Sequence, residues 1–167
     1  IKSCASMNQT HSNKIISAKK SGNYKSDGIF TSKKNLGLIV KTADCMPIFL
    51  KDKTSIGAVH VGWKGIKNKI IINALKNFNL NELLMSVGPH AQSCCYEVKE
   101  DVSKYLYEYI DKREGKEYLH MSQSLIDLSN KIGFKIEVSS ICTICDSSYN
   151  SYRENKTSKR QYGLIWK

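Results

Sequence analysis

Residues 42–50 read TADCMPIFL and residues 56–65 read IGAVHVGWKG, and the polar turn 51–55 separates these two apolar runs. Each run has the length of a β-strand, so the pair predicts two neighbouring strands joined by a short turn. Each run also carries one reactive side chain, Cys45 in the first and His60 in the second. An unpaired polar group in a protein interior costs about 1–3 kcal/mol, so a buried His60 needs a partner. We expect that partner to be a thiolate on the neighbouring strand or a metal ion held between the strands.

The length and composition favour one globular domain over residues 1–167. The chain is 41% apolar and 25% charged, which is typical of a folded protein with a sizeable core. No apolar stretch approaches the roughly 18 residues that span a bilayer, and the N-terminal residues lack the apolar segment of a secretory signal. We therefore expect a cytoplasmic protein with no membrane partner.

The net charge of +11 raises the question of nucleic-acid binding. The lysines are spread along the chain, and the arginines, whose planar group favours phosphate recognition, are only Arg113, Arg153 and Arg160. We therefore expect no nucleic-acid partner, whereas small molecules that carry phosphate remain candidate ligands. The sequence gives no signal for the oligomeric state.

Apolar periodicity predicts strands and helices that alternate along the chain. Strands are expected at 36–40, 83–87 and 134–139, and helices at 65–79, 98–109 and 122–132. The polar stretch 151–160 followed by 162–166 is interpreted as a C-terminal β-hairpin. This order indicates an α/β (α+β) fold with mixed sheets covered by helices.

The remaining cysteines and histidines give weak signals one by one. Without a secretory signal, the six cysteines are expected to be reduced. Cys142 and Cys145 form a C-x-x-C pair without a second pair at zinc-knuckle spacing, so their role stays open. Cys94 and Cys95 are interpreted as packing residues, and the two histidines outside the motifs discussed here are expected at the surface, namely His90 and His120.

Several motifs occur together and in a fixed order. They are T-A-D-C-M-P at 42–47, A-V-H-V-G-W-K-G at 58–65, G-P at 88–89, C-C-Y-E-V at 94–98, C-T at 142–143, and S-Y-R…R…I-W between 151 and 166. From about Gln9 onward, the chain resembles the YfiH-like family, whose members have been called laccase-domain or multicopper polyphenol oxidases and later purine nucleoside phosphorylases. The resemblance implies layered mixed sheets, as in cysteine-dependent toxin deamidases. The chain is expected to lack the N-terminal segment that family members carry before the first motif.

The resemblance implies a zinc site made by three residues. They are His11 in the Q-x-H motif, Cys45 in A-D-C and His60 in H-x-G-W. The chemistry agrees, because imidazoles and thiolates are good zinc ligands and three protein ligands leave a fourth position open for catalysis. Multicopper chemistry needs many histidines, and the chain has four in all, so copper is disfavoured.

Other residues are candidates for roles around this site. Asp44, next to Cys45, either orients a ligand or a water in catalysis, or caps a turn. Trp63 is expected to form a pocket wall or to belong to the core. Arg153 and Arg160 are candidates for contacts with phosphate or ribose, or for a structural ion pair.

These residues support several functions. The first is a zinc-dependent purine nucleoside phosphorylase or adenosine deaminase that acts on adenosine, inosine or methylthioadenosine, with phosphate as co-substrate. The second is a hydrolase or amidase, for example in peptidoglycan-precursor editing, in which His60 activates Cys45 as a nucleophile. The third is a non-catalytic, zinc-stabilised interaction domain, in which Cys142 or Cys145 closes the metal site.

Overall fold

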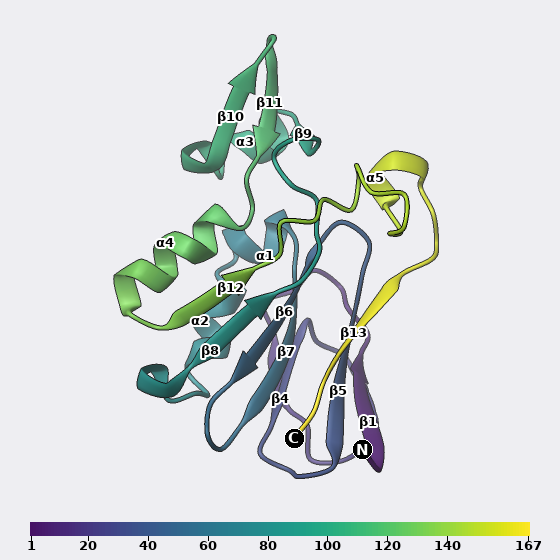
Figure 1. Ribbon diagram of the computed structural model, residues 1–167, viewed down its shortest axis with the longest axis vertical. Coiled ribbons are helices and arrows are strands. Elements are labelled where there is room, and N and C mark those ends of the chain that lie inside the picture. Colours follow the sequence, from purple (N-terminus) through teal and green to yellow (C-terminus); the bar gives the residue numbers. More distant parts are fainter.

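The computed structural model describes residues 1–167 and arranges them in three layers, with a small sheet at one end (Figure 1). The middle layer is a six-stranded sheet made, in spatial order, of β12 (Lys135–Val138), β8 (Leu84–Val87), β6 (Met46–Lys51), β7 (Ile56–Val61), β4 (Gly28–Thr31) and β2 (Ile15–Ser17). One outer layer is a four-stranded sheet of β13 (Gln161–Ile165), β5 (Leu36–Thr42), β1 (Ser3–Met7) and β3 (Gly22–Tyr24). The small sheet contains β10 (Ile110–Arg113), β11 (Lys116–Leu119) and β9 (Glu97–Val98).

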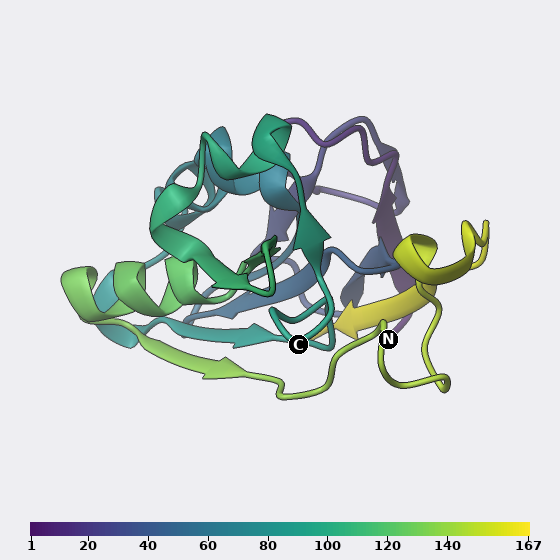
Figure 2. The same ribbon diagram turned by 90° about the horizontal axis from the view of Figure 1, so that it is seen from above.

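The helices α1 (Trp63–Lys67), α2 (Ile70–Leu75) and α4 (Gln123–Ile132) form the other outer layer, on the side of β8 and β12, whereas α3 (Glu100–Ser103) lies beside the small sheet and α5 (Tyr152–Asn155) near the start of β13 (Figures 1 and 2). The 3-10 helices are η1 (Leu80–Glu82) and η2 (Tyr107–Tyr109). No helix combines the length and the apolar character that a bilayer crossing requires. This mixed arrangement confirms the predicted α/β class.

The central strand β7 is buried on both faces because it lies between two cores. Ile56 and Ala58 belong to the core between the two large sheets, whereas Val59 and Val61 belong to the core beneath the helices. Side chains alternate along a strand, so His60 points toward the same side as Ile56 and Ala58. This alternation puts the imidazole between the sheets, at the end of β7 where the sheets separate.

The two predicted strands pair as expected. β6 and β7 are antiparallel neighbours, with Met46 opposite Val61 and Pro47 opposite His60. Pro47 is the second residue of its strand, near an end, where the missing backbone N–H is tolerated. Cys45 precedes β6 directly, so it lies beside His60.

The expected helix at 65–79 is interrupted. Lys69 has a left-handed backbone, with φ of 56°, and its N–H donates to the Ile66 carbonyl, so α1 ends there and α2 begins at Ile70. Similarly, the helix expected at 98–109 is reduced to α3 and η2. The apolar spacing identified the buried face in both cases, but it does not specify that the backbone is continuous.

The prediction of a C-terminal hairpin was wrong. Residues 152–155 form α5, whose first turn is capped by the Ser151 side chain, which accepts from the Glu154 N–H. β13 pairs antiparallel with β5 instead, with Gln161 opposite Thr42. The reason is tertiary, because β5 offers an unpaired edge to which a distant strand can add. In contrast, α4 forms as predicted and ends at Gly133, with φ of 95°.

Candidate functional site

The structure brings His11, Cys45 and His60 together. Their donor atoms all lie within 4.8 Å of one another, and the Cys45 Sγ is 3.9 Å from the His11 Nε2. The two imidazole rings meet edge to face, with centroids 4.8 Å apart. The three residues come from the loop after β1, the residue before β6 and strand β7. The cluster can therefore hold a metal ion.

A buried carboxylate that sequence reasoning missed orders this cluster. Asp27 lies just before β4, and its Oδ1 is 2.8 Å from the His60 Nδ1. The same carboxylate accepts hydrogen bonds from the backbone N–H groups of Thr10, His11 and Ser12 and from the Ser12 hydroxyl. Asp27 thus fixes one imidazole directly and the loop of the other through its backbone. In the sequence it belongs to an Asp-Gly pair, which is common in turns and gives no signal of a site.

Asp27 sets the direction of the two histidine donors, and Gly62 leaves space for the third donor, the Cys45 sulfur. Because the His60 Nδ1 is engaged by Asp27, its Nε2 is left for the cluster. His11 has a left-handed backbone, with φ of 59°, and its N–H donates to Asp27 at 2.9 Å. Gly62 leaves room for the sulfur, because a Cβ at this position would lie 2.7 Å from the Cys45 Sγ.

The three titratable groups shift one another's pKa values. Burial raises the pKa of the Asp27 carboxyl, but hydrogen bonds from His60 and Ser12 outweigh it and leave the pKa well below its usual range. Burial lowers the pKa of His60, but Asp27 and Cys45 raise it to about 9. Burial raises the pKa of the Cys45 thiol, whereas His11 and His60 lower it to about 7. Without a metal, the site therefore favours a thiolate beside an imidazolium.

Asp44 serves as a link between distant segments. Its carboxylate accepts from the Thr143 hydroxyl at 3.0 Å and from the Arg153 N–H at 2.6 Å. Its carbonyl accepts from the Ala91 N–H at 2.9 Å, and its backbone is left-handed, with φ of 84°. Asp44 directly precedes Cys45, so these bonds hold α5 and the loop of Thr143 close to the Cys45 sulfur.

The three donors lie in a cleft of about 720 Å³. Its lining includes four cationic side chains, Lys41, Lys64, Arg153 and Arg160, and four aromatic ones, Trp63, Tyr96, Tyr152 and Tyr162. The cleft thus contains Trp63, Arg153 and Arg160, the three residues suggested as ligand contacts. Of the remaining lining residues, the sequence gave no signal for Lys41 or Tyr96.

Cations and aromatic rings are interleaved in this cleft. The Arg153 guanidinium lies 5.0 Å from the centroid of the Tyr96 ring, and the Lys64 ammonium lies 5.6 Å from the Trp63 ring. Arg160 donates to the carbonyls of its own loop, at Thr157 and Lys159. None of these cations takes part in a salt bridge with a carboxylate. The cleft therefore suits a ligand with an anionic group and a flat ring.

Several expectations about other residues change. The expectation that all six cysteines are reduced was wrong, because the fold brings Cys95 and Cys145 together in a disulfide. Cys94 and Cys95 are not buried packing residues either, since Cys94 is exposed and Cys95 belongs to that disulfide. Cys142 and Cys145 do not join the histidine site, because their sulfurs cluster with those of Cys94 and Cys95.

His90 is fully buried, not at the surface, and its Nδ1 bonds to the Gly88 carbonyl. The physical reason is that residue 90 forms a β-bridge with Cys142, so that two loops cover it. His120, also expected at the surface, is half-buried.

The sequence and the fold of this chain are similar to those of known proteins. The family profile described as "Multi-copper polyphenol oxidoreductase laccase" matches residues 1–167. The chain belongs to the multi-copper polyphenol oxidoreductase laccase family. The YfiH-like resemblance is thereby confirmed, since the Bacillus licheniformis structure named YfiH is 25% identical, with a TM-score of 0.87 over 98% of this chain and 74% of that one. A Neisseria meningitidis structure, NMB0706, has a TM-score of 0.90 at 23% identity, covers 98% of this chain and 74% of its own, and supports the fold.

Curated relatives in this laccase family carry another enzyme name. A protein of Aquifex aeolicus named purine nucleoside phosphorylase is 36% identical over 158 residues, which are 91% of this chain and 77% of the relative. One of Borreliella burgdorferi with the same name is 34% identical over 84% of this chain and 68% of its own length. The description of the family and the names of both relatives are therefore names of enzymes.

Proposed function

We propose that this chain is a metal-dependent purine nucleoside phosphorylase that holds zinc with His11, Cys45 and His60. The observation that carries the proposal is the position of these donors on a cleft whose wall alternates cations with aromatic rings. A nucleoside offers a flat base, and inorganic phosphate offers an anion, so the lining matches both partners of a phosphorolysis. The names of the relatives support the same reaction.

The donor set fits a zinc ion. The engagement of His60 Nδ1 by Asp27 is the arrangement that orients metal-binding histidines in proteins. Two imidazoles and one thiolate suit zinc, and they also suit copper, so metal analysis has to decide between them. When bound with an open position, zinc acts as a Lewis acid on a ligand oxygen or nitrogen.

The side chains of the cleft position the two substrates. Arg153 and Arg160, with Lys41 and Lys64, would bind phosphate and hold one of its oxygens against the C1′ of the nucleoside. The attacking oxygen forms a bond to C1′ while the bond from C1′ to the purine nitrogen breaks. The base leaves with the electron pair and takes up the proton that hydrogen phosphate loses. Stacking on Trp63 or the tyrosines would keep the leaving purine in place. The products are the free base and ribose 1-phosphate.

A second candidate is a cysteine hydrolase or amidase. The observation that favours it is the order Asp27, His60, Cys45, in which a carboxylate orients the imidazole beside a thiol whose pKa is lowered to about 7. Metal separates the two candidates, because a thiolate that coordinates zinc is a poor nucleophile. Activity that persists after removal of metal would support the hydrolase.

The test uses zinc-loaded protein, adenosine and phosphate. Phosphorolysis gives adenine and ribose 1-phosphate only when phosphate is present, whereas deamination gives inosine without it. Inosine and methylthioadenosine should be tested in parallel. We expect phosphate-dependent adenine that disappears after chelation and returns with zinc. Zinc-loaded protein that gives no product from any of these nucleosides would overturn the proposal and favour a zinc-stabilised interaction domain.

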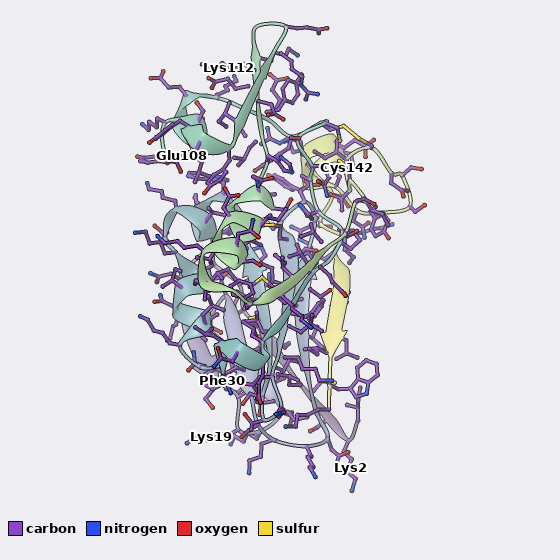
Figure 3. The ribbon with its side chains drawn as sticks, turned by 60° about the vertical axis from the view of Figure 1, so that its left-hand side comes forward. Lys2, Lys19, Phe30, Glu108, Lys112 and Cys142 are labelled. Carbon is purple, nitrogen blue, oxygen red and sulfur yellow. A yellow bond between two sulfur atoms is a disulfide. The ribbon has the colours of Figure 1, made fainter.

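The cleft cations supply a sharper test of the same reaction. Arg153→Ala and Arg160→Ala should each raise the KM for phosphate about 10–100-fold, since a hydrogen bond to a charged group contributes about 1.5–3 kcal/mol. The KM for the nucleoside should change less. Lys19→Ala is a charge-matched control, because Lys19 is exposed and is not among the residues that line the cleft; Figure 3 shows it in the lower part of the molecule, whereas Cys142 lies in the upper part. Equal effects of the arginine and Lys19 substitutions would contradict the assignment.

A further inference from the structure

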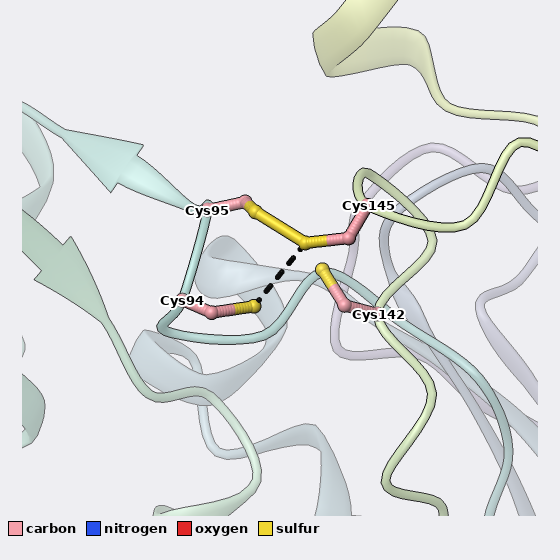
Figure 4. Close-up of side chains that lie close together, drawn as sticks. All are labelled: Cys94, Cys95, Cys142 and Cys145. Carbon is pink, nitrogen blue, oxygen red and sulfur yellow. Dashed lines mark hydrogen bonds between the residues drawn. A yellow bond between two sulfur atoms is a disulfide. The ribbon is translucent and has the colours of Figure 1, made fainter.

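Four cysteines gather in a second cluster, outside the histidine site. The sulfur atoms of Cys94, Cys95, Cys142 and Cys145 all lie within 4.8 Å of one another. They come from two loops about 50 residues apart in the chain, and all four side chains point into the same space (Figure 4). In this structure Cys95 and Cys145 are joined by a disulfide, and the Cys94 sulfur is 3.4 Å from that of Cys145.

The size of the cluster matches a tetrahedral metal site. A zinc ion bound by four thiolates at about 2.3 Å requires sulfurs about 3.8 Å apart. Cys95 and Cys145 are closer than this because they share a disulfide, whereas the Cys94 and Cys145 sulfurs are 3.4 Å apart and no pair exceeds 4.8 Å. Cys142 and Cys145 have the C-x-x-C spacing of a zinc knuckle, and the second pair that the sequence seemed to lack is the vicinal Cys94-Cys95.

Hydrogen-bond donors face the Cys142 sulfur, and a cation lies at the edge of the cluster. The Gln92 N–H donates to the Cys142 sulfur at 3.4 Å, and the N–H groups of Ile144 and Cys145 also face this sulfur. The Arg113 guanidinium donates to the carbonyls of Ser93 and Cys94, which brings a positive charge to the edge of the cluster. Backbone N–H groups and a nearby cation stabilise the negative charge that four thiolates bring to a divalent metal.

The cluster joins the two loops that support the catalytic cleft. Tyr96, which follows Cys95, lines the cleft, and Thr143, which follows Cys142, donates to Asp44 beside Cys45. We propose that Cys94, Cys95, Cys142 and Cys145 form a structural tetrathiolate site for Zn²⁺ that clamps these loops. The site is closed, because four protein ligands complete a tetrahedron, so its zinc would be structural.

The disulfide and the zinc site are two redox states of the same cluster. A dithiol reductant would open the disulfide between Cys95 and Cys145, becoming a disulfide itself and leaving two thiols on the protein. The four thiols then bind Zn²⁺ and release four protons. An oxidant of the disulfide class reverses the exchange: it is itself reduced to two thiols, the disulfide between Cys95 and Cys145 reforms, and Cys94 and Cys142 take up protons as the ion leaves.

The test counts zinc in a chain whose histidine site is disabled. Reduced Cys45→Ser protein is loaded with Zn²⁺, desalted and analysed for metal. We expect about one zinc ion per chain. Adding Cys142→Ser should abolish binding, whereas adding Cys4→Ser, a matched control outside both clusters, should not. A Cys45→Ser chain without zinc, or one that keeps its zinc when Cys142 is replaced, would overturn the proposal.

A second measurement does not depend on the folding of the Cys142 variant. The Cys45→Ser chain keeps five of its six cysteines, and zinc should protect four of them from a thiol reagent, leaving Cys4 reactive. Cobalt in place of zinc should give the strong absorption of a tetrathiolate complex. Protection of fewer thiols, or a cobalt spectrum without thiolate bands, would contradict the assignment. Neither result depends on nucleoside cleavage, so this proposal and the proposed function can fail separately.

Discussion

Asp27 Oδ1 lies 2.8 Å from Nδ1 of His60, and the two side chains are 0% and 6% exposed. The same carboxylate accepts three backbone N–H bonds from residues 10–12, so one buried group fixes two of the three donors. The carboxylate is thus a partner of His60 that the sequence did not suggest, and it engages only the Nδ1 atom. The Nε2 atom remains available to the Cys45 thiolate or a metal.

Asp27→Asn should weaken metal binding. The amide keeps the size of the carboxylate but loses its charge, and loss of such a partner typically lowers metal affinity about 10–100-fold. Competition with a zinc chelator measures the effect. Asp52→Asn is the matched control, because Asp52 is another buried carboxylate that accepts from backbone N–H groups, at Ser55 and Asn79, away from the site. Equal losses of affinity in the two variants would refute the role of Asp27.

In the metal-free protein, the Cys45–His60 pair should leave the free energy of unfolding nearly constant between about pH 7 and 9. The His60 pKa rises from 6.5 to about 9, so alone it contributes stability that is present below pH 6.5 and lost as pH rises through 9. The Cys45 pKa falls from 9.0 to about 7, so its contribution is present above pH 9 and lost as pH falls through 7. Between these limits the folded chain holds the proton on His60 and the unfolded chain holds it on Cys45, so the two slopes cancel.

Cys45→Ser removes one of these two contributions. The free energy of unfolding of the metal-free variant should then fall as pH rises above 6.5, by less than about 3 kcal/mol, because Asp27 without Cys45 raises the His60 pKa to a smaller extent. Urea unfolding with a chelator present, at several pH values, measures the difference between variant and parent chain. Parallel pH profiles for the two chains would show that the pair is not coupled.

Gly62→Ala should displace the thiol. The new Cβ would lie 2.7 Å from the Cys45 Sγ, so the sulfur or the start of α1 must move. We expect metal affinity to fall at least about tenfold, because misplaced ligands lose coordination geometry. Gly65→Ala is the control, since the atoms nearest its Cβ are side-chain atoms of Ile70 and Val61 and then the backbone oxygen of His60 at 3.9 Å, none of which is a metal donor. Unchanged affinity in Gly62→Ala would show that the sulfur tolerates the shift.

Asp44→Asn should separate positioning from catalysis. The substitution weakens the bonds to Thr143 and to the Arg153 N–H, at a cost of about 1–3 kcal/mol in stability. Because Arg153 then moves, the KM for phosphate should rise while the bound zinc stays unchanged. Thr143→Val, which removes one of the same bonds, should produce a milder form of this effect. A loss of kcat with an unchanged KM would instead give Asp44 a direct part in the chemistry.

The sequence by itself predicted the central strand pair and the neighbourhood of Cys45 and His60, whereas His11, 34 residues before Cys45, was named only through the family resemblance. Period-two alternation places His60 on a defined face of β7, and the motif residue Cys45 directly precedes the adjoining strand. Strand pairing joins segments close in the chain, so local pattern suffices. The periodicity of α4 was likewise sufficient, because helix formation depends on neighbouring residues.

Only the tertiary structure decided the groups that complete the site. Asp27 and His60 are separated by 33 residues, Asp44 and Arg153 by 109, and Cys95 and Cys145 by 50. No local periodicity relates such residues, because their approach depends on how the loops and sheets pack. A carboxylate before a glycine and two pairs of cysteines are common in sequences. Their chemistry appears when the fold brings them within bonding distance of their partners and, for Asp27, also removes the carboxylate from water.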